Sequence, residues 1–387
     1  MNGREVVIVE AVRTPIGRGH PEKGYYRDVH PNVLLGSAYQ AVLDRAGVDP
    51  LEVGDVIAGC VQQVGEQGFN VARNAWLQAG LPPEVPATTV DRQCGSAQQA
   101  VNFAASLVAS GVHDVVIGGG VEHMGRIPLF VGRKWAGDIG TPFPPELLDR
   151  FALVDQGQSA EMIAERWDIS REELDAFALR SHLNATAARD ERRFDRETVP
   201  VAANGTTHVD DQGIRPDTSL DALAALPPAF RKDGKITAGN SSQISDGAAA
   251  VLLASRERAS ELGLTPRARI VDQTTVGVDP VIMLTGPIPA TRKILARNGM
   301  TVDDVDLFEV NEAFASVVLA WERELQPDPG RVNVNGGSIA LGHPLGSTGA
   351  RLLATLVSEL ERSDGAIGLV TMCCGGGLGT ATLIERL

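Results

Sequence analysis

One cysteine, Cys94, lies where a strand-like stretch at residues 87–90 gives way to a run of small residues that begins at Gly95. A thiol at the start of a helix faces unpaired backbone N–H groups and the positive end of the helix dipole. Both favour the thiolate, which is the reactive form of cysteine. The position indicates a nucleophile, although most free cysteines are buried apolar residues. This segment alone leaves both interpretations open.

Two more segments hold polar side chains in unusual settings. Asn311 and Glu312 interrupt an apolar stretch directly after a strand-like run at residues 305–308, where a helix cap is the simpler explanation. His343 is one of only seven histidines and lies in a loop among five glycines. Glycines at such density indicate a tightly specified backbone. A catalytic base and an ordinary loop histidine both fit this pattern.

A fourth segment combines thiols with bare backbone. Cys373 and Cys374 end a strand-like run and precede three glycines that begin at Gly375. The N–H groups of such a turn suit an oxyanion or a phosphate, although a plain glycine turn has the same sequence. No dinucleotide or P-loop motif is present. The spacing of Cys94, His343 and Cys373 matches no metal site, so we expect no metal.

Composition excludes several classes of protein. The chain has 387 residues and a formal charge of -14, from 35 Lys and Arg against 49 Asp and Glu. An acidic surface argues against nucleic acid as a partner. Four cysteines in so long a chain provide no disulfide framework. No apolar run reaches membrane-spanning length and the first residues do not form a signal peptide, so we expect a cytoplasmic protein.

The order of elements indicates an α/β fold. Short apolar runs alternate with helical patterns over the first 120 residues, and this alternation predicts a mainly parallel sheet covered on both faces. The predicted strands are residues 6–9, 56–58, 87–90 and 114–117, and the last runs into three glycines at 118–120. The predicted helices are 33–46, 70–79 and 95–110.

The middle of the chain differs in composition from the first 120 residues. Residues 121–242 are richer in charge, proline and polar loops, with one clear helix at 171–189 behind a Ser170 cap and Glu173. We interpret this segment as an insertion that covers the core. Alternation resumes after Asp246.

The last part of the chain repeats the order of residues 87–120. A predicted strand at 331–335, a glycine-rich turn, a helix at 347–361, a strand at 366–371 and a second triple glycine follow one another as in the earlier copy. Cys94 precedes the helix in the first copy and His343 precedes it in the second. The echo predicts two diverged copies of one α/β unit.

Taken together, these segments resemble the thiolases, and specifically the degradative 3-ketoacyl-CoA thiolases. The resemblance runs nearly end to end, through residues 9–17, 88–100, 237–248, 309–315, 336–349 and the Cys-x-Gly at 373–375. It implies a thiolase fold, in which two repeated halves form a layered α/β/α/β/α core with an inserted loop domain. The halves would be residues 1–120, completed by 243–265, and 266–387. Residues 121–242 would be the insertion that covers the CoA site.

The resemblance also implies a mechanism. Cys94 would attack the 3-keto carbon of a 3-ketoacyl-CoA, release acetyl-CoA and pass the acyl group to a second CoA. His343 would accept thiol protons, and Cys373 would exchange a proton at C2. A thiol's ordinary pKa of about 8.5 would let Cys373 do so near neutrality without large tuning. One oxyanion would be held by His343 and a water on Asn311, the other by the N–H groups of Cys94 and Gly375.

By the same resemblance, Ser242 lies near the pantetheine of CoA, Arg215 near its adenine, and Ala238 in the same site. CoA and acyl-CoA thioesters are the expected partners. CoA is a substrate, so no cofactor is expected. Thiolases form dimers or tetramers, so a homodimer or homotetramer is expected.

Two departures bear on substrate and roles. Asp155 and Gln156 stand where short-chain biosynthetic relatives have a His-Met pair, so Gln156 is assigned to an acyl pocket larger than an acetoacetyl group needs. Fatty acid β-oxidation and steroid side-chain degradation both fit such a pocket. Cys374 takes a position that is usually aliphatic, so Cys373 is the predicted acid/base.

Four alternatives stay open on sequence. The nearest is a biosynthetic acetyl-CoA acetyltransferase, which runs the same residues toward condensation. A 3-ketoacyl-ACP synthase shares the fold but pairs its cysteine with two histidines or with histidine and asparagine. A thiolase-like lipid-binding protein and a redox protein that uses Cys94 with Cys373 complete the set.

Overall fold

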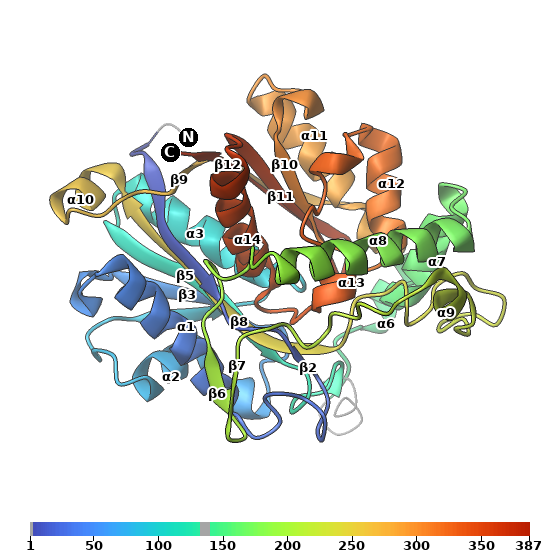
Figure 1. Cartoon of the computed structure of the whole chain (residues 1–387), viewed down its shortest axis with the longest axis horizontal. Coiled ribbons are helices and arrows are strands. Elements are labelled where there is room, and N and C mark those ends of the chain that lie inside the picture. Colours follow the sequence, from blue (N-terminus) through green and yellow to red (C-terminus); the bar gives the residue numbers. More distant parts are fainter. Residues whose placement is uncertain (1–2, 132–139) are drawn as a thin grey trace.

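The computed structural model describes residues 3–131 and 140–387. Ten of its strands form one hydrogen-bonded set in the order β10-β11-β12-β9-β1-β8-β5-β3-β4, with β2 paired to β8, and β6 and β7 form a separate hairpin (Figure 1). The strands are β1 Val6–Arg13, β2 Gly17–Arg18, β3 Asp55–Gly59, β4 Ala87–Val90, β5 Val115–His123, β6 Val201–Ala203, β7 Thr206–His208, β8 Ser245–Ser255, β9 Ala268–Gly277, β10 Leu307–Val310, β11 Ile367–Cys374 and β12 Leu378–Arg386.

Helices cover and separate the two halves of this sheet. They are α1 Pro31–Ala46, α2 Val71–Gln78, α3 Ser96–Ser110, α6 Pro145–Arg150, α7 Gln156–Arg166, α8 Arg171–Asp190, α9 Leu220–Ala224, α10 Arg256–Glu261, α11 Pro287–Arg297, α12 Ala315–Leu325, α13 Ser338–Leu341 and α14 Thr348–Ser363.

Three apolar clusters define the layers. One cluster packs α1 and α2 against β1, β3, β5 and β8. A second packs α11 and α12 against β10, β11 and β12. The third places α3 and α14 between the two halves, in contact with strands of both, and Figure 1 shows this pair of helices at the centre of the molecule. Because each half of the sheet is covered on both faces, the expected α/β/α/β/α order is confirmed.

The two halves share one pairing pattern. In each, a parallel pair (β3–β5 or β10–β11) is followed by two antiparallel pairs (β5–β8–β1 or β11–β12–β9). The halves meet where β1 pairs with β9 at Val7–Arg269 and Ile8–Ala268. Within the first 120 residues β3 pairs in parallel with β4 and β5, as expected, but β1 pairs antiparallel with β8 and β9, and the sheet as a whole is mainly antiparallel. The reason is visible at Gly375-Gly376-Gly377, a three-residue turn that joins β11 to β12, because strands joined by so short a turn must run antiparallel.

Several local predictions are confirmed. β4 spans the predicted residues, α1 ends at Gly47 with a left-handed φ of 68°, and α8 begins with the capping box of Ser170 and Glu173. The predicted helices at 70–79, 95–110 and 347–361 appear as α2, α3 and α14 with shifts of one or two residues at their ends.

The predicted strand at 331–335 is wrong. A 3₁₀ helix occupies Pro329–Arg331, and only Val332 bridges to the sheet, at Phe308. Asn333 has a left-handed φ of 47°, and its side-chain amide takes both backbone groups of Val310, at 2.8 and 2.9 Å. The Asn333 side chain therefore makes the hydrogen bonds to Val310 that the backbone of the predicted strand would have made.

The strand predicted at 114–117 is longer than expected, because the glycines at 118–120 continue β5 to His123. A Cβ on Gly120 would lie 1.9 Å from the carbonyl oxygen of Gly346. The glycines are needed for the close approach of the His343 loop to the strand, and not for a turn.

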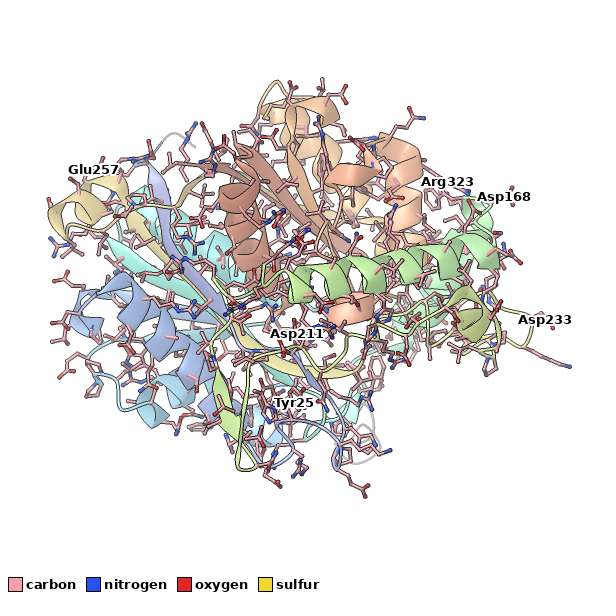
Figure 2. The ribbon with its side chains drawn as sticks, viewed as in Figure 1. Tyr25, Asp168, Asp211, Asp233, Glu257 and Arg323 are labelled. Atoms are coloured by element: carbon pink, nitrogen blue, oxygen red, sulfur yellow. The ribbon has the colours of Figure 1, made fainter. Side chains whose placement is uncertain are left out.

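The segment from 121 to 242 is tied to the core by buried charges. Arg13 of β1 donates to Asp211 at 2.7 and 2.9 Å and to Glu197 at 2.5 Å, and all three side chains are almost fully buried. Figure 2 locates Asp211 near the centre of the molecule. Removing one partner from such a group is costly, so this pairing fixes the segment on the core. Within the described ranges, no helix combines the length and the apolar character needed to span a membrane.

Candidate active site

Cys94 sits in a tight turn directly before α3. Gln93 has a left-handed φ of 50°, which is strained for a residue with a side chain. Its N–H donates to Asp91 Oδ1 at 2.6 Å, and its carbonyl accepts from the Ser96 hydroxyl at 2.6 Å. Strain held by surrounding contacts is typical of functional sites. This turn fixes the position of the Cys94 thiol at the mouth of the helix.

Burial raises the pKa of Cys94 to about 11, and three hydrogen bonds oppose the rise. They come from the Gly375 N–H, the Gln156 side chain and the N–H of Cys94 itself. The expectation that the helix start makes Cys94 a thiolate is therefore wrong, because burial outweighs the helix terminus. Cys94 is a neutral thiol at rest, so the predicted role as a nucleophile would require a base.

His343, the predicted base, lies in the loop between α13 and α14. Its Nε2 lies 3.3 Å from the Asn311 Nδ2, and its Nδ1 lies 2.7 Å from the Thr348 hydroxyl. The Thr348 hydroxyl donates to the Pro344 carbonyl at 2.8 Å, so it accepts from His343 Nδ1–H. Nε2 therefore carries the lone pair. The backbone N–H of His343 donates to Ser245 Oγ at 3.1 Å.

Burial, reinforced by the positive charge of Arg351, lowers the pKa of His343 to about 3. The imidazole is neutral at physiological pH and any proton that it accepts is readily passed on. A neutral thiol and a neutral imidazole suit a proton transfer that occurs only when substrate is attacked.

Cys373 and Cys374 lie at the end of β11. Cys373 packs into the outer apolar cluster, whereas Cys374 packs against Gly95, where a Cβ would lie 2.6 Å from its sulfur. Burial, with the charges of Cys94 and Cys374, raises the pKa of Cys373 well above its ordinary value. Burial and the charge of Cys94 also raise the pKa of Cys374. The expectation that Cys373 titrates near neutrality without tuning is wrong, and it rests as a proton donor.

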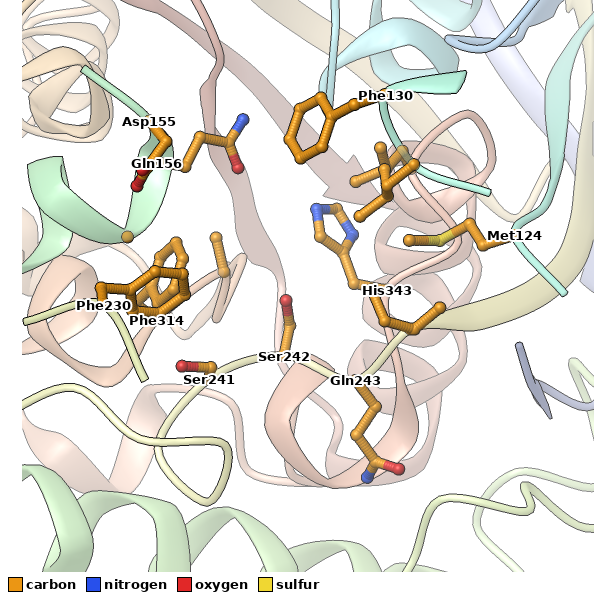
Figure 3. A pocket seen from close by; sticks show the side chains of 15 residues that line it. Met124, Phe130, Asp155, Gln156, Phe230, Ser241, Ser242, Gln243, Phe314 and His343 are labelled. Carbon is orange, nitrogen blue, oxygen red and sulfur yellow. The ribbon is translucent and has the colours of Figure 1, made fainter. Parts of the chain in front are cut away.

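Three cavities meet around these residues. One of about 470 Å³ is lined by His343, Gln156 and Ser242, and in Figure 3 the Gln156 amide and the His343 ring project into the same space, with Ser242 below them. A second of about 650 Å³ is lined by Cys94 and Gln156. A third of about 540 Å³ is lined by Gly375 and Gln156. Gln156 is therefore at the junction of all three.

A fourth cavity of about 490 Å³ leads outward. It contains Arg215, Ala238 and Ser242 together with Arg18, and it shares residues 241–244 with the His343 cavity. The shared wall places this fourth cavity, here called the outer channel, beside the His343 cavity. Its two arginines make a local basic mouth on an acidic chain.

The structure thus brings together all the predicted site residues in two connected groups. Cys94, Gly375, Gln156 and His343 line the inner cavities. Asn311 contacts His343, and Cys373 lies close enough to Cys94 for the two thiols to interact electrostatically. Ser242, Ala238 and Arg215 line the outer channel.

Sequence reasoning missed three polar residues, Ser338, Thr348 and Arg351. Ser338 Oγ donates to Asn311 Oδ1 at 2.7 Å and accepts from Arg351 Nη2 at 3.0 Å. An arginine within the buried face of a helix was the available signal, because such a residue is rarely buried without a partner.

No metal centre is found among residues 3–131 and 140–387, where no three His, Cys, Asp or Glu side chains gather closely enough to hold an ion. The four cysteines are free and buried.

Comparison with known proteins gives consistent matches over the whole chain. The family models described as "Thiolase, N-terminal domain" and "Thiolase, C-terminal domain" match residues 6–257 and 264–386. A steroid 3-ketoacyl-CoA thiolase, FadA6, of Mycobacterium tuberculosis is 47% identical, over 100% of this chain and 96% of its own length. A 3-ketoacyl-CoA thiolase of Cronobacter sakazakii is 45% identical, over 99% and 100%.

Among solved structures, the acetyl-CoA acetyltransferase of Bacillus anthracis superposes with a TM-score of 0.90 and 42% identity, covering 100% of this chain and 99% of that one. The two chains are therefore similar in sequence as well as in fold.

Proposed function

The chain belongs to the thiolase family, and from that premise we propose that it cleaves a 3-ketoacyl-CoA with a second CoA, giving acetyl-CoA and a shortened acyl-CoA. The observation that carries the proposal is the position of Gln156. It shares one cavity wall with Cys94 and another with His343, so a nucleophile and a base border one connected space.

In the first half-reaction, Cys94 Sγ bonds to C3 of the substrate while its proton passes to His343 Nε2. The C2–C3 bond then breaks, its electron pair stays on C2, and Cys373 donates a proton there to complete acetyl-CoA. The acyl group remains on Cys94 as a thioester. Because both cysteines rest as thiols, each has the proton that its role requires.

In the second half-reaction, the thiol of a new CoA attacks the acyl thioester. By then His343 has passed the Cys94 proton to the Cys373 thiolate, so it can take the proton of the new CoA thiol. Cys94 leaves as a thiolate and receives that proton from His343, which restores the starting state before the next cycle. The acyl-enzyme intermediate makes the kinetics ping-pong.

Negative charge develops on two oxygens, and separate donors serve them. His343, once its Nε2 has taken the Cys94 proton, and a water held by Asn311 would serve one oxygen, and the N–H groups of Cys94 and Gly375 would serve the other. The direction of the Gly375 N–H toward the Cys94 sulfur supports the second assignment. Donors fixed before the reaction stabilise a transition state without reorganising.

We assign the acyl group to the two apolar cavities that meet at Gln156. Their walls include Phe130, Phe143, Leu148 and Met283. At about 540 and 650 Å³ they exceed what an acetoacetyl group needs, and the 47% identity to a steroid 3-ketoacyl-CoA thiolase supports a bulky, steroid-derived acyl chain.

We assign CoA to the outer channel. Ser242 and Ala238 line its wall, and Arg215 at its mouth would attract the phosphates and adenine of CoA. Residues 121–242 would form the loop domain over this channel, between halves at 1–120, completed by 243–265, and 266–387. CoA acts as a substrate, and the enzyme would work in the cytoplasm without a cofactor.

The quaternary state is proposed to be a homodimer or homotetramer. The edge strand β4 supports this, since it ends the hydrogen-bonded set of strands and its free edge is a template for a second chain. Phe69, close by in sequence, is 98% exposed.

A biosynthetic acetyl-CoA acetyltransferase is the second candidate, favoured by the 42% identity to the Bacillus anthracis enzyme. The test is a panel of acetoacetyl, medium-chain, long-chain and steroid-type 3-ketoacyl-CoA esters, with excess CoA and Cys94→Ala as control. Preference for a longer or bulkier ester supports the degradative proposal. Activity confined to acetoacetyl-CoA supports the second candidate, and equal turnover by Cys94→Ala contradicts both.

A further inference from the structure

Asn311 can serve its proposed role only in one of two orientations. Its amide must present NH₂ to His343 Nε2, as the 3.3 Å contact requires, and a flip would present oxygen instead. Asn311 is fully buried, so no solvent fixes the choice. Some neighbour must determine which way the amide points.

We propose that Ser338 and Arg351 are positioning residues that set the direction of a hydrogen-bond chain running from Arg351 through Ser338, Asn311 and His343 to Thr348. This inference rests on the proposed function only for its effect on turnover.

The chain starts at a group that can only donate. A guanidinium has no acceptor, so Arg351 Nη2 donates to Ser338 Oγ, at 3.0 Å. The single proton of the Ser338 hydroxyl cannot return to Arg351, and it donates to Asn311 at 2.7 Å. Asn311 Oδ1 is the one acceptor found for this proton among the described residues, so a flipped amide would leave the buried hydroxyl without an acceptor. Asn311 therefore turns its oxygen toward Ser338, which leaves its NH₂ for His343.

The chain ends at a group that can only accept. The Pro344 carbonyl takes the Thr348 proton at 2.8 Å, and Thr348 then accepts from His343 Nδ1 at 2.7 Å. Both ends impose the same direction. Every intermediate proton is fixed, and His343 is held as the tautomer with its proton on Nδ1.

Without Ser338, Arg351 no longer fixes the direction in which the hydrogen bonds of the chain run. The Asn311 amide is then free to flip and accept from a proton on Nε2, while Thr348 turns its hydroxyl to donate to Nδ1. In that reversed state His343 has no lone pair on Nε2, the nitrogen beside Asn311, and the base is lost. The fraction of reversed molecules then limits the rate.

Nitrogen-15 NMR of histidine side chains tests the wild-type chain directly, because protonated and unprotonated ring nitrogens have distinct shifts. A His343→Gln sample assigns the His343 signals. We expect neutral His343 with its proton on Nδ1. A proton on Nε2 in the wild type overturns the inference. This readout needs no substrate, so it stands even if no 3-ketoacyl-CoA is cleaved and the proposed function fails.

The key variant is Ser338→Ala, and its matched control is Ser358→Ala. Ser358 lies on α14, is buried, and accepts from Arg267 at 3.2 Å, so the control removes an equivalent Arg–Ser hydrogen bond outside the site. We expect Ser338→Ala to lower kcat about tenfold with KM nearly unchanged, as loss of one hydrogen bond of about 1.4 kcal/mol predicts. A new signal from Nε2-protonated His343 should appear.

A second pair of variants covers the case in which Ser338→Ala fails to fold. Arg351→Lys keeps a group that can only donate, and Arg351→Gln introduces an acceptor. We expect the Nδ1 tautomer to persist in the lysine variant and to mix with the other in the glutamine variant. Unchanged tautomer and kcat in Ser338→Ala, an equal loss in Ser358→Ala, or identical spectra of the two Arg351 variants would contradict the inference.

Discussion

Replacing Asn311 with alanine tests the His343 side of the site in the most quantitative way. The substitution removes the Nδ2 donor that lies 3.3 Å from His343 Nε2 and would hold the water at the first oxyanion. Loss of one preorganised donor costs about 2.7–4 kcal/mol in the transition state, which is about a 10²–10³-fold loss in kcat. Cys94→Ala removes the nucleophile and abolishes turnover, whereas Asn311→Ala keeps a small residual rate.

The same substitution also affects stability. The buried Ser338 hydroxyl loses its acceptor, which costs about 1–3 kcal/mol of unfolding free energy. Asn311→Asp is the matched control, because it keeps the size of the side chain and an oxygen for Ser338 while removing the N–H group. We expect the aspartate variant to lose kcat as severely as the alanine variant, so the loss follows the donor and not the volume.

The assay is steady-state thiolysis at saturating CoA, with urea unfolding of each variant beside it. The expected pattern is a large fall in kcat with a KM close to that of the wild type. A kcat within threefold of the wild type in both variants, or a loss confined to KM, would refute the role of Asn311.

Three further predictions concern the thiols and the core. With a pKa of about 11, Cys94 should react with iodoacetamide at a rate that keeps rising from pH 8 to pH 10, and a plateau near pH 8.5 in the difference from Cys94→Ala would contradict the burial argument. Cys373→Ser should stop exchange of the methyl hydrogens of acetyl-CoA with deuterated water, while Cys374→Ser retains it, and the reverse result would move the acid/base role to Cys374. Asp211→Asn should lower the unfolding free energy by about 3 kcal/mol in urea, against almost none for the exposed Asp195→Asn, and equal effects would show that the buried pair does not hold the segment.

Local signals in the sequence predicted those parts of the fold that depend on neighbouring residues. The capping box of α8 and the left-handed Gly47 at the end of α1 can be read from a few adjacent residues. The strand at 331–335 failed because Asn333 satisfies Val310 by its side chain, which no apolar pattern reveals. The direction of β8 depends on its pairing with the distant strands β1 and β5 in the same way.

The sequence likewise predicted the residues of the candidate site better than their protonation states and buried partners. Residue types and a family resemblance predicted Cys94, His343, Cys373 and Asn311. They could not predict that Cys94 rests as a thiol, because its pKa depends on burial by distant segments. Arg351 escaped notice since its partner, Ser338, is thirteen residues away on another helix.

The central claim is that Cys94 carries the acyl group between two CoA molecules. It is tested most directly by mixing the enzyme with a 3-ketoacyl-CoA in the absence of free CoA and mapping the adduct by mass spectrometry. The account predicts release of about one acetyl-CoA per subunit and an acyl thioester on the Cys94 peptide, discharged when CoA is added. An adduct on another residue, or cleavage of substrate with no adduct at all, would contradict it.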